Sequence, residues 1–123
     1  MEPTDSPLIA IVDDDELFRR SVERLVRSAG FRVETFGSAE DFLECGNLDH
    51  TACAILDVKL PGMNGVDLQR RLMTRPRPMP IVFVSAQEDA VMRATALRAG
   101  AIAFLKKPFD DGTLLDALDR ATR

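Results

Sequence analysis

Five polar side chains stand directly after short apolar runs or one residue further on, and their types could act together if the fold brings them to one place. They are Asp13, Asp14, Asp57, Ser85 and Lys107. Three carboxylates close together repel one another and raise at least one pKa unless a cation relieves them. Oxygen ligands without a usable His or Cys favour a hard divalent cation, and Mg²⁺ fits best. Since Mg²⁺ commonly combines protein carboxylates with phosphate oxygens, the set predicts a magnesium site that receives phosphate.

The remaining two side chains supply what phosphate recognition requires. The ammonium group of Lys107 offers a point charge to one phosphate oxygen, and the Ser85 hydroxyl offers a hydrogen bond to another. The sequence contains neither a Walker loop nor a Gly-x-Gly-x-x-Gly segment after its first apolar run, so no nucleotide or dinucleotide cofactor is expected. The remaining hypothesis is that one of the carboxylates itself accepts a phosphoryl group.

The elements that must position these side chains alternate regularly along the chain. Five runs predict strands: Leu8–Val12, Arg32–Phe36, Ala52–Leu56, Ile81–Val84 and Ala101–Leu105. Helices are predicted after each strand, with Gly30 and Gly100 ending the first and fourth of them. Ser38-Ala39-Glu40-Asp41 resembles a capping box at the start of the second helix. Strict alternation predicts one α/β domain whose parallel sheet carries helices on both faces.

This architecture predicts where the chemistry lies. Ligands of open parallel sheets bind outside the carboxyl ends of the strands. The five polar side chains follow the first, third, fourth and fifth predicted strands, so we expect them to converge at one edge of the sheet. By contrast, the four arginines of the first helix are expected to form a solvated helix face; they are Arg19, Arg20, Arg24 and Arg27.

Composition narrows the functional classes further. The chain has 123 residues and a net charge of −4, which argues against nucleic acid or an anionic membrane as its main partner. No uninterrupted apolar run exceeds the length of Leu8–Val12, so no membrane span is expected. With no visible signal peptide, a cytoplasmic location is expected. Two cysteines and one histidine predict neither a disulfide scaffold nor a zinc site.

Four motifs, in this order and spacing, resemble those of bacterial response-regulator receiver domains of two-component signalling. They are Ile11-Val12-Asp13-Asp14-Asp15, Leu56–Gly65, Val84-Ser85-Ala86 and Phe104–Phe109. The resemblance covers about residues 9–120, and Ser38–Leu43 with Ala99-Gly100-Ala101 resembles the FixJ-like branch. It implies a flavodoxin-like, CheY-like doubly wound sheet in the order 2-1-3-4-5 with five helices. Residues 1–7 would form a flexible tail and residues 8–123 the receiver domain.

The resemblance also implies roles for single residues. Asp57 resembles the phosphoacceptor. Asp14, Asp57 and the backbone carbonyl of Lys59 would bind Mg²⁺ directly, and Asp13 mainly through water. Beyond Mg²⁺, no cofactor is implied.

Further roles concern the phosphoryl oxygens and the switch. Ser85, the Ala86 amide and Lys107 would contact the phosphoryl oxygens, and Ser85 with Phe104 would form the switch pair. The bond before Pro108 would be cis. Ser85 replaces the commoner threonine, and Phe104 lacks the hydroxyl that some relatives carry on tyrosine.

The implied function is a phosphorylation-controlled switch rather than an enzyme with a separate substrate. Asp57 would take a phosphoryl group from a sensor histidine kinase, with slow autodephosphorylation, and a homodimer would form through the fourth helix, fifth strand and last helix. The resemblance fits either a stand-alone receiver or a fragment of a transcription factor, and in the second case transcription would be controlled through a C-terminal DNA-binding domain outside this chain. Two alternatives stay open: an interaction module without phosphotransfer, and a flavin-binding electron carrier, against which the missing phosphate loop argues.

Overall fold

The computed structural model describes residues 6–87 and 89–123, and these form five strands that alternate with five helices. The strands are β1 (Leu8–Val12), β2 (Arg32–Phe36), β3 (Thr51–Asp57), β4 (Ile81–Ser85) and β5 (Ala103–Lys106). The helices are α1 (Glu16–Ser28), α2 (Ala39–Cys45), α3 (Gly65–Met73), α4 (Ala90–Arg98) and α5 (Asp111–Thr122). The predicted alternation of strands and helices is confirmed.

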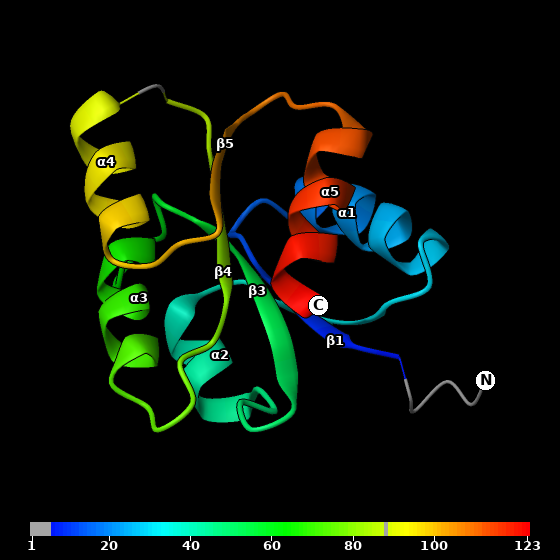
Figure 1. Ribbon diagram of the computed structural model, residues 1–123, viewed down its shortest axis with the longest axis horizontal. Helices are drawn as coiled ribbons and strands as arrows, with labels where there is room; N and C mark the ends of the chain where they lie inside the picture. The colour runs from blue at the N-terminus through cyan, green and yellow to red at the C-terminus, as the bar shows by residue number, and fades with distance from the viewer. Residues whose placement is uncertain (1–5, 88) are drawn as a thin grey trace.

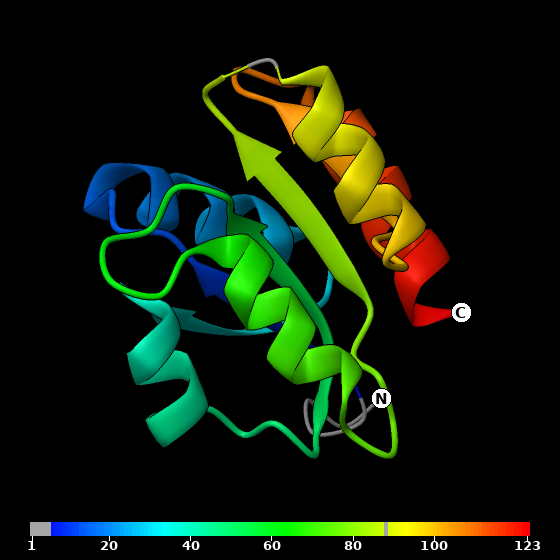
Figure 2. The same ribbon diagram turned by 90° about the vertical axis from the view of Figure 1, so that its left-hand side faces the viewer.

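The strands form one parallel sheet in the order β2-β1-β3-β4-β5. Helices α1 and α5 cover one face of the sheet, and α2, α3 and α4 cover the other (Figure 1, and Figure 2 after a quarter turn). The doubly wound class and its strand order, 2-1-3-4-5, are therefore confirmed.

Two apolar layers hold the sheet between the helices. Successive side chains of a strand point to opposite faces, so Ile9 and Ile11 pack under α1 and α5, whereas Ala10 and Val12 pack under α2 and α3. All four are fully buried. Burial on both faces explains why β1 is an uninterrupted apolar run instead of an alternating one.

Capping side chains start four of the helices directly after the loops that leave the strands. Each accepts a hydrogen bond from an amide in the first turn of its helix; they are Asp15, Ser38, Asn64 and Asp89. Such a cap is typically worth about 1 kcal/mol. At the other end, Gly30 and Gly100 adopt positive φ angles of 96° and 106° just past α1 and α4, which confirms their predicted place.

The fifth strand begins two residues later than predicted. The Ala101 amide donates to the Ala96 carbonyl at 3.1 Å, a bond that closes the end of α4. Ile102 then donates to the Ile81 carbonyl at 2.7 Å before the regular ladder starts at Ala103. The apolar pattern assigned Ala101 to the strand, but its backbone amide is taken up by the hydrogen bond that ends α4.

The predicted tail and domain boundary fall only partly within the described residues, because residues 1–5 lie outside them. Ser6 and Pro7 are tied to β2: their carbonyls accept hydrogen bonds from the side chain and amide of Arg32, at 2.8 and 3.0 Å. These two residues therefore differ from the expected loose tail. Among the described residues, no helix is long and apolar enough to cross a membrane.

Candidate functional site at the carboxyl edge of the sheet

The three predicted acidic residues meet where β1 and β3 end. One carboxylate oxygen each from Asp13, Asp14 and Asp57 lies within 4.8 Å of the others. Asp13 and Asp57 are 1% and 8% exposed, whereas Asp14 is exposed to solvent. The next acid in the sequence, Asp15, instead caps α1 through the amides of its first turn. The cluster thus has two buried carboxylates and one on its solvent-exposed side, an arrangement that suits a divalent cation that enters from solvent.

Lys107 reaches this cluster from the end of β5. Its Nζ lies 2.7 Å from Asp13 Oδ2 and 3.6 Å from Asp57 Oδ2. The same ammonium stands 3.9 Å from the centre of the Phe18 ring, a cation–π contact from α1. The bond between Lys107 and Pro108 is cis, as the resemblance implies. The ammonium therefore sits between the two buried carboxylates, nearer to Asp13.

Asp57 lies in an environment that opposes its ionisation. Burial, and then repulsion from Asp13, raise the pKa of the Asp57 carboxyl to about 6. Lys107 and the Lys59 amide, which donates to Asp57 Oδ1 at 3.3 Å, oppose this rise. A divalent cation beside the three carboxylates would remove the repulsion and favour the ionised form.

Ser85 ends β4 and is 4% exposed. Its hydroxyl donates to the Gln87 carbonyl at 3.0 Å and accepts from the Gln87 amide at 3.1 Å. The neighbouring residue, Ala86, is exposed. In this arrangement the hydroxyl is engaged by its own turn rather than by Asp57.

Phe104 lies inside the molecule on β5. It is 5% exposed, and its ring centre is 6.0 Å from that of Phe83 on β4. The Phe104 carbonyl accepts a hydrogen bond from Arg93 of α4 at 2.7 Å. The aromatic side chain therefore packs in the core between the sheet and α4, close to the end of β4.

The loop after β3 brings Lys59 beside the cluster. The Gly65 amide donates to the Val58 carbonyl at 2.9 Å and closes the base of this loop. A Cβ atom on Gly65 would overlap the Asp57 carbonyl, so only glycine fits this close approach. Lys59 itself is exposed and contributes its amide to Asp57.

Sequence reasoning missed two contacts of the site. Arg19, which was assigned to a solvated helix face, is half-buried and donates to the Asp13 carbonyl at 2.6 Å. Glu40, which was assigned to a capping box, accepts from the Met63 amide at 2.9 Å, although the Ser38 half of the box is present. From the sequence, each of these side chains could be predicted only to lie on the polar surface of a helix. Its hydrogen-bond partner lies outside that helix and could not be predicted.

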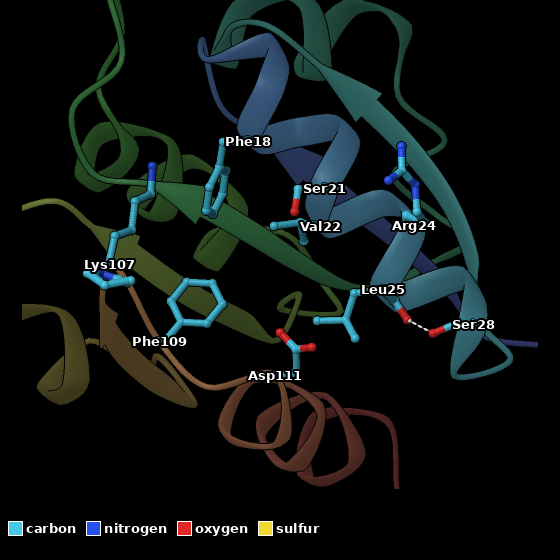
Figure 3. Close-up of a pocket in the computed structure, with 10 residues that line it drawn as sticks. Phe18, Ser21, Val22, Arg24, Leu25, Ser28, Lys107, Phe109 and Asp111 are labelled. Atoms are coloured by element: carbon cyan, nitrogen blue, oxygen red, sulfur yellow. Dashed lines mark hydrogen bonds between the residues drawn. The ribbon is translucent and has the colours of Figure 1, made fainter.

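An apolar groove borders the site between α1 and α5 (Figure 3). It has a volume of about 580 Å³, and Lys107 lies at its end. Within it, Phe18 meets Phe109 edge to face, with their ring centres 6.1 Å apart.

Comparison with known proteins places this geometry in a family. The family described as "Response regulator receiver domain" matches residues 9–119. Nodulation protein W of Bradyrhizobium diazoefficiens is 41% identical over 121 residues, which cover 98% of this chain and 53% of the relative. The transcriptional regulatory protein FixJ of the same species is 35% identical over 115 residues, which cover 94% of this chain and 56% of FixJ. The chain thus spans about half the length of these curated relatives.

Solved structures agree with the sequence relatives. The response regulator StyR superposes with a TM-score of 0.87 and 44% identity, over 95% of this chain and 59% of StyR. The BeF3-activated receiver domain of DrrB superposes with a TM-score of 0.85 and 28% identity, over 94% and 97% of the two chains. With the matching sequence span, strand order and acidic cluster, the chain belongs to the response-regulator receiver domains of two-component systems, in their FixJ-like branch.

Proposed function

We propose that Asp57 is the phosphoacceptor of this receiver domain and that a phosphohistidine of a sensor histidine kinase is its donor. The observation that carries the proposal is the convergence of Asp13, Asp14 and Lys107 on a buried Asp57. Two acids and an ammonium around one further carboxylate suit a phosphoryl group that needs both a cation and a point charge.

The chemistry is a transfer between two nucleophiles. An Asp57 carboxylate oxygen attacks phosphorus, the phosphorus–nitrogen bond breaks, and the imidazole nitrogen keeps the electron pair and takes up a proton. The product is an aspartyl phosphate, which water later hydrolyses to the free carboxylate and inorganic phosphate. The domain assists its own phosphorylation and slow autodephosphorylation and acts as a signalling phosphoacceptor, without a separate substrate.

The residues present fit Mg²⁺. Asp14, Asp57 and the backbone carbonyl of Lys59 are the proposed direct ligands, and Asp13 is the proposed ligand through water. The donor set consists of oxygen atoms alone, and the raised pKa of Asp57 reflects a repulsion that a cation would relieve. When bound, Mg²⁺ would neutralise part of the negative charge on the phosphoryl oxygens.

Three further groups are proposed to hold the phosphoryl oxygens: the Ser85 hydroxyl, the Ala86 amide and the Lys107 ammonium. For Ser85, this requires its hydroxyl to leave Gln87 and turn toward Asp57. That movement vacates space behind β4, which Phe104 was expected to fill by turning inward. The Phe104 ring already lies inside the molecule, 5% exposed, while Ser85 still bonds to Gln87, so the movement proposed for Phe104 is a shift within the core, coupled to the turn of Ser85.

The proposed output is a homodimer that forms through α4, β5 and α5 on phosphorylation. Relatives of which this chain covers about half carry names such as transcriptional regulatory protein, which supports an output on transcription. In this proposal, DNA is bound only by a separate C-terminal domain outside the 123 residues, with residues 8–123 as the receiver, and the protein acts in the cytoplasm.

Phosphorylation with a small donor tests the acceptor directly. Incubation with acetyl phosphate and Mg²⁺ should add one phosphoryl mass to the wild type and none to Asp57→Asn, because an amide is a poor nucleophile. Asp14→Ala should fold and stay largely unlabelled at the same Mg²⁺ concentration. Intact-protein mass spectrometry reads all three. Labelling that survives in Asp57→Asn would move the acceptor elsewhere, and an unlabelled wild type would favour an interaction module without phosphotransfer.

A further inference from the structure

The loop between β3 and α3, residues 58–64, is held at its tip by a carboxylate from another element. Glu40 lies in the first turn of α2, and its Oε2 accepts a hydrogen bond from the Met63 amide at 2.9 Å. The two residues are 23 positions apart in the sequence. The bond therefore joins α2 to the loop that follows the proposed acceptor.

The shape of the loop tip matches the carboxylate. Gly62, directly before Met63, has a φ of +74°. A Cβ atom at Gly62 would overlap Oε2 of Glu40, so the carboxylate lies directly over a backbone without a side chain. The left-handed turn and the missing side chain at Gly62 together let Glu40 reach the amide.

The position of Glu40 is itself well defined. Ser38 caps α2 by accepting from the Asp41 amide at 3.1 Å, and the neighbouring Ala39 is fully buried. The hydrogen bond from Met63, followed by that from its own amide, lowers the pKa of the Glu40 carboxyl below its ordinary value. Glu40 is thus a charged acceptor on a fixed helix start.

The loop that Glu40 holds also contributes backbone groups to the acidic cluster. Its base is closed by the bond from the Gly65 amide to Val58, and its Lys59 amide donates to Asp57 Oδ1. Lys59 lies between the closed base and the tip. A loop fixed at both places restricts where the Lys59 backbone can lie relative to Asp57.

We propose that Glu40 is a positioning residue of the phosphorylation site, which holds the β3–α3 loop so that the Lys59 backbone faces Asp57. Glu40 acts only through the loop and touches neither the metal nor the phosphoryl group. The inference rests on the proposed function of Asp57 and adds a residue of α2 to the site.

Metal affinity is the first test. Glu40→Ala should raise the dissociation constant for Mg²⁺ in isothermal titration calorimetry by up to about tenfold, the lower end of the loss when a group bonded directly to a ligand is removed, because Glu40 acts on Lys59 only through the loop. Glu40→Gln keeps a carbonyl acceptor for the Met63 amide and should recover most of the affinity. The matched control is Glu44→Ala, which removes the same charge one turn along α2 from an exposed side chain. Its Mg²⁺ affinity should equal that of the wild type.

Hydrogen–deuterium exchange is the second test and does not depend on metal or phosphate. The Met63 amide should exchange faster in Glu40→Ala than in the wild type or in Glu44→Ala, while the amides of β1 and β3 keep their protection. Equal Met63 exchange in all three would overturn the contact itself.

The two tests separate the inference from the proposed function. A wild type that binds Mg²⁺ and is phosphorylated, together with a Glu40→Ala that binds Mg²⁺ equally well, overturns the positioning role and leaves Asp57 as acceptor. A Glu40→Gln as weak as Glu40→Ala also overturns it, because the loss would then follow charge and not the hydrogen bond. A wild type without Mg²⁺ binding overturns both.

Discussion

At the scale of single residues, Asp57 shows how burial and charge set the state of a carboxyl group. The residue is 8% exposed, and burial with the neighbouring Asp13 raises its pKa to about 6. Lys107 opposes this, but its ammonium stands closer to Asp13, at 2.7 Å against 3.6 Å. The metal-free site therefore holds more negative charge than one ammonium balances.

This imbalance predicts a pH dependence of stability in metal-free protein. Because the pKa of Asp57 is higher in the folded state, the folded protein binds more protons, and its stability falls as pH rises from about 4 to above 6. Asp57→Asn should not lose stability in this pH range through this position, because asparagine does not ionise. The free energy of unfolding of the variant should match that of the wild type near pH 4, and exceed it above pH 6 by on the order of 2 kcal/mol.

Urea unfolding in chelator across this range measures the difference. Subtracting the two profiles removes the contribution of the other acids, among them Glu40, whose pKa is shifted in the opposite direction. If the free energies of unfolding of the two proteins changed with pH in parallel, ionisation of Asp57 would not destabilise the folded protein. A difference that grows toward low pH would show that its pKa is lowered.

At the scale of elements, α4 is fastened to α3 by one buried polar side chain. Gln69 is 2% exposed, and its Nε2 donates to the Ala96 carbonyl at 3.0 Å. The same carbonyl accepts the Ala101 amide that closes the helix. The C-terminal end of α4 is thus tied both to α3 and to the short segment that leads into β5. Nearer the N-terminal end of α4, Arg93 donates to the Phe104 carbonyl.

Removing the Gln69 amide should destabilise the fold. Gln69→Ala loses a buried hydrogen bond and leaves a cavity, and should cost about 2–3 kcal/mol in urea unfolding. Gln69→Met keeps most of the volume without the donor and should cost about 1 kcal/mol. The control is Arg70→Ala, whose exposed pairing with Asp67 at 3.5 Å is expected to contribute under about 1 kcal/mol. A Gln69→Ala as stable as Arg70→Ala would contradict this account of α4.

At the scale of the whole molecule, α4, β5 and α5 lie together at one edge of the sheet (Figures 1 and 2). Phe104, the proposed switch residue, is buried on β5 beneath this edge. Exposed charges of both signs occur on it, with Arg98 on α4 and Asp116 and Asp119 on α5. A two-fold symmetric dimer could pair the basic set of one copy with the acidic set of the other.

Loading the site should therefore change the oligomeric state. The unmodified protein should sediment as a monomer at micromolar concentration, and as a dimer with Mg²⁺ and beryllofluoride, a phosphoryl mimic. Arg98→Glu should weaken the dimer without changing phosphorylation, and adding Asp116→Arg should partly restore it. The control is Glu44→Arg, which reverses an exposed charge on α2, a helix that packs beside β2 at the opposite edge of the sheet. A fully loaded monomer, or a dimer that forms equally in Asp57→Asn, would defeat the proposed output.

Much of this protein is determined by sequence patterns that act locally. A parallel strand buried on both faces must be apolar throughout, so β1 could be read directly from its run, and the acids that end β1 and β3 necessarily fall at one sheet edge. The caps and the positive-φ glycines are local as well, because each satisfies backbone groups within its own helix end. The fold class and the acidic cluster follow from such rules.

Only the tertiary structure decided which side chains meet across elements. Lys107 pairs most closely with Asp13, 94 residues away, and Glu40 on α2 accepts a hydrogen bond from Met63 in the loop after Asp57. Arg19 turns from a presumed solvated face to the Asp13 carbonyl. Periodicity assigns a residue to a helix face, but the partner of a polar group depends on how elements distant in sequence pack, to within the few tenths of an ångström that a hydrogen bond allows.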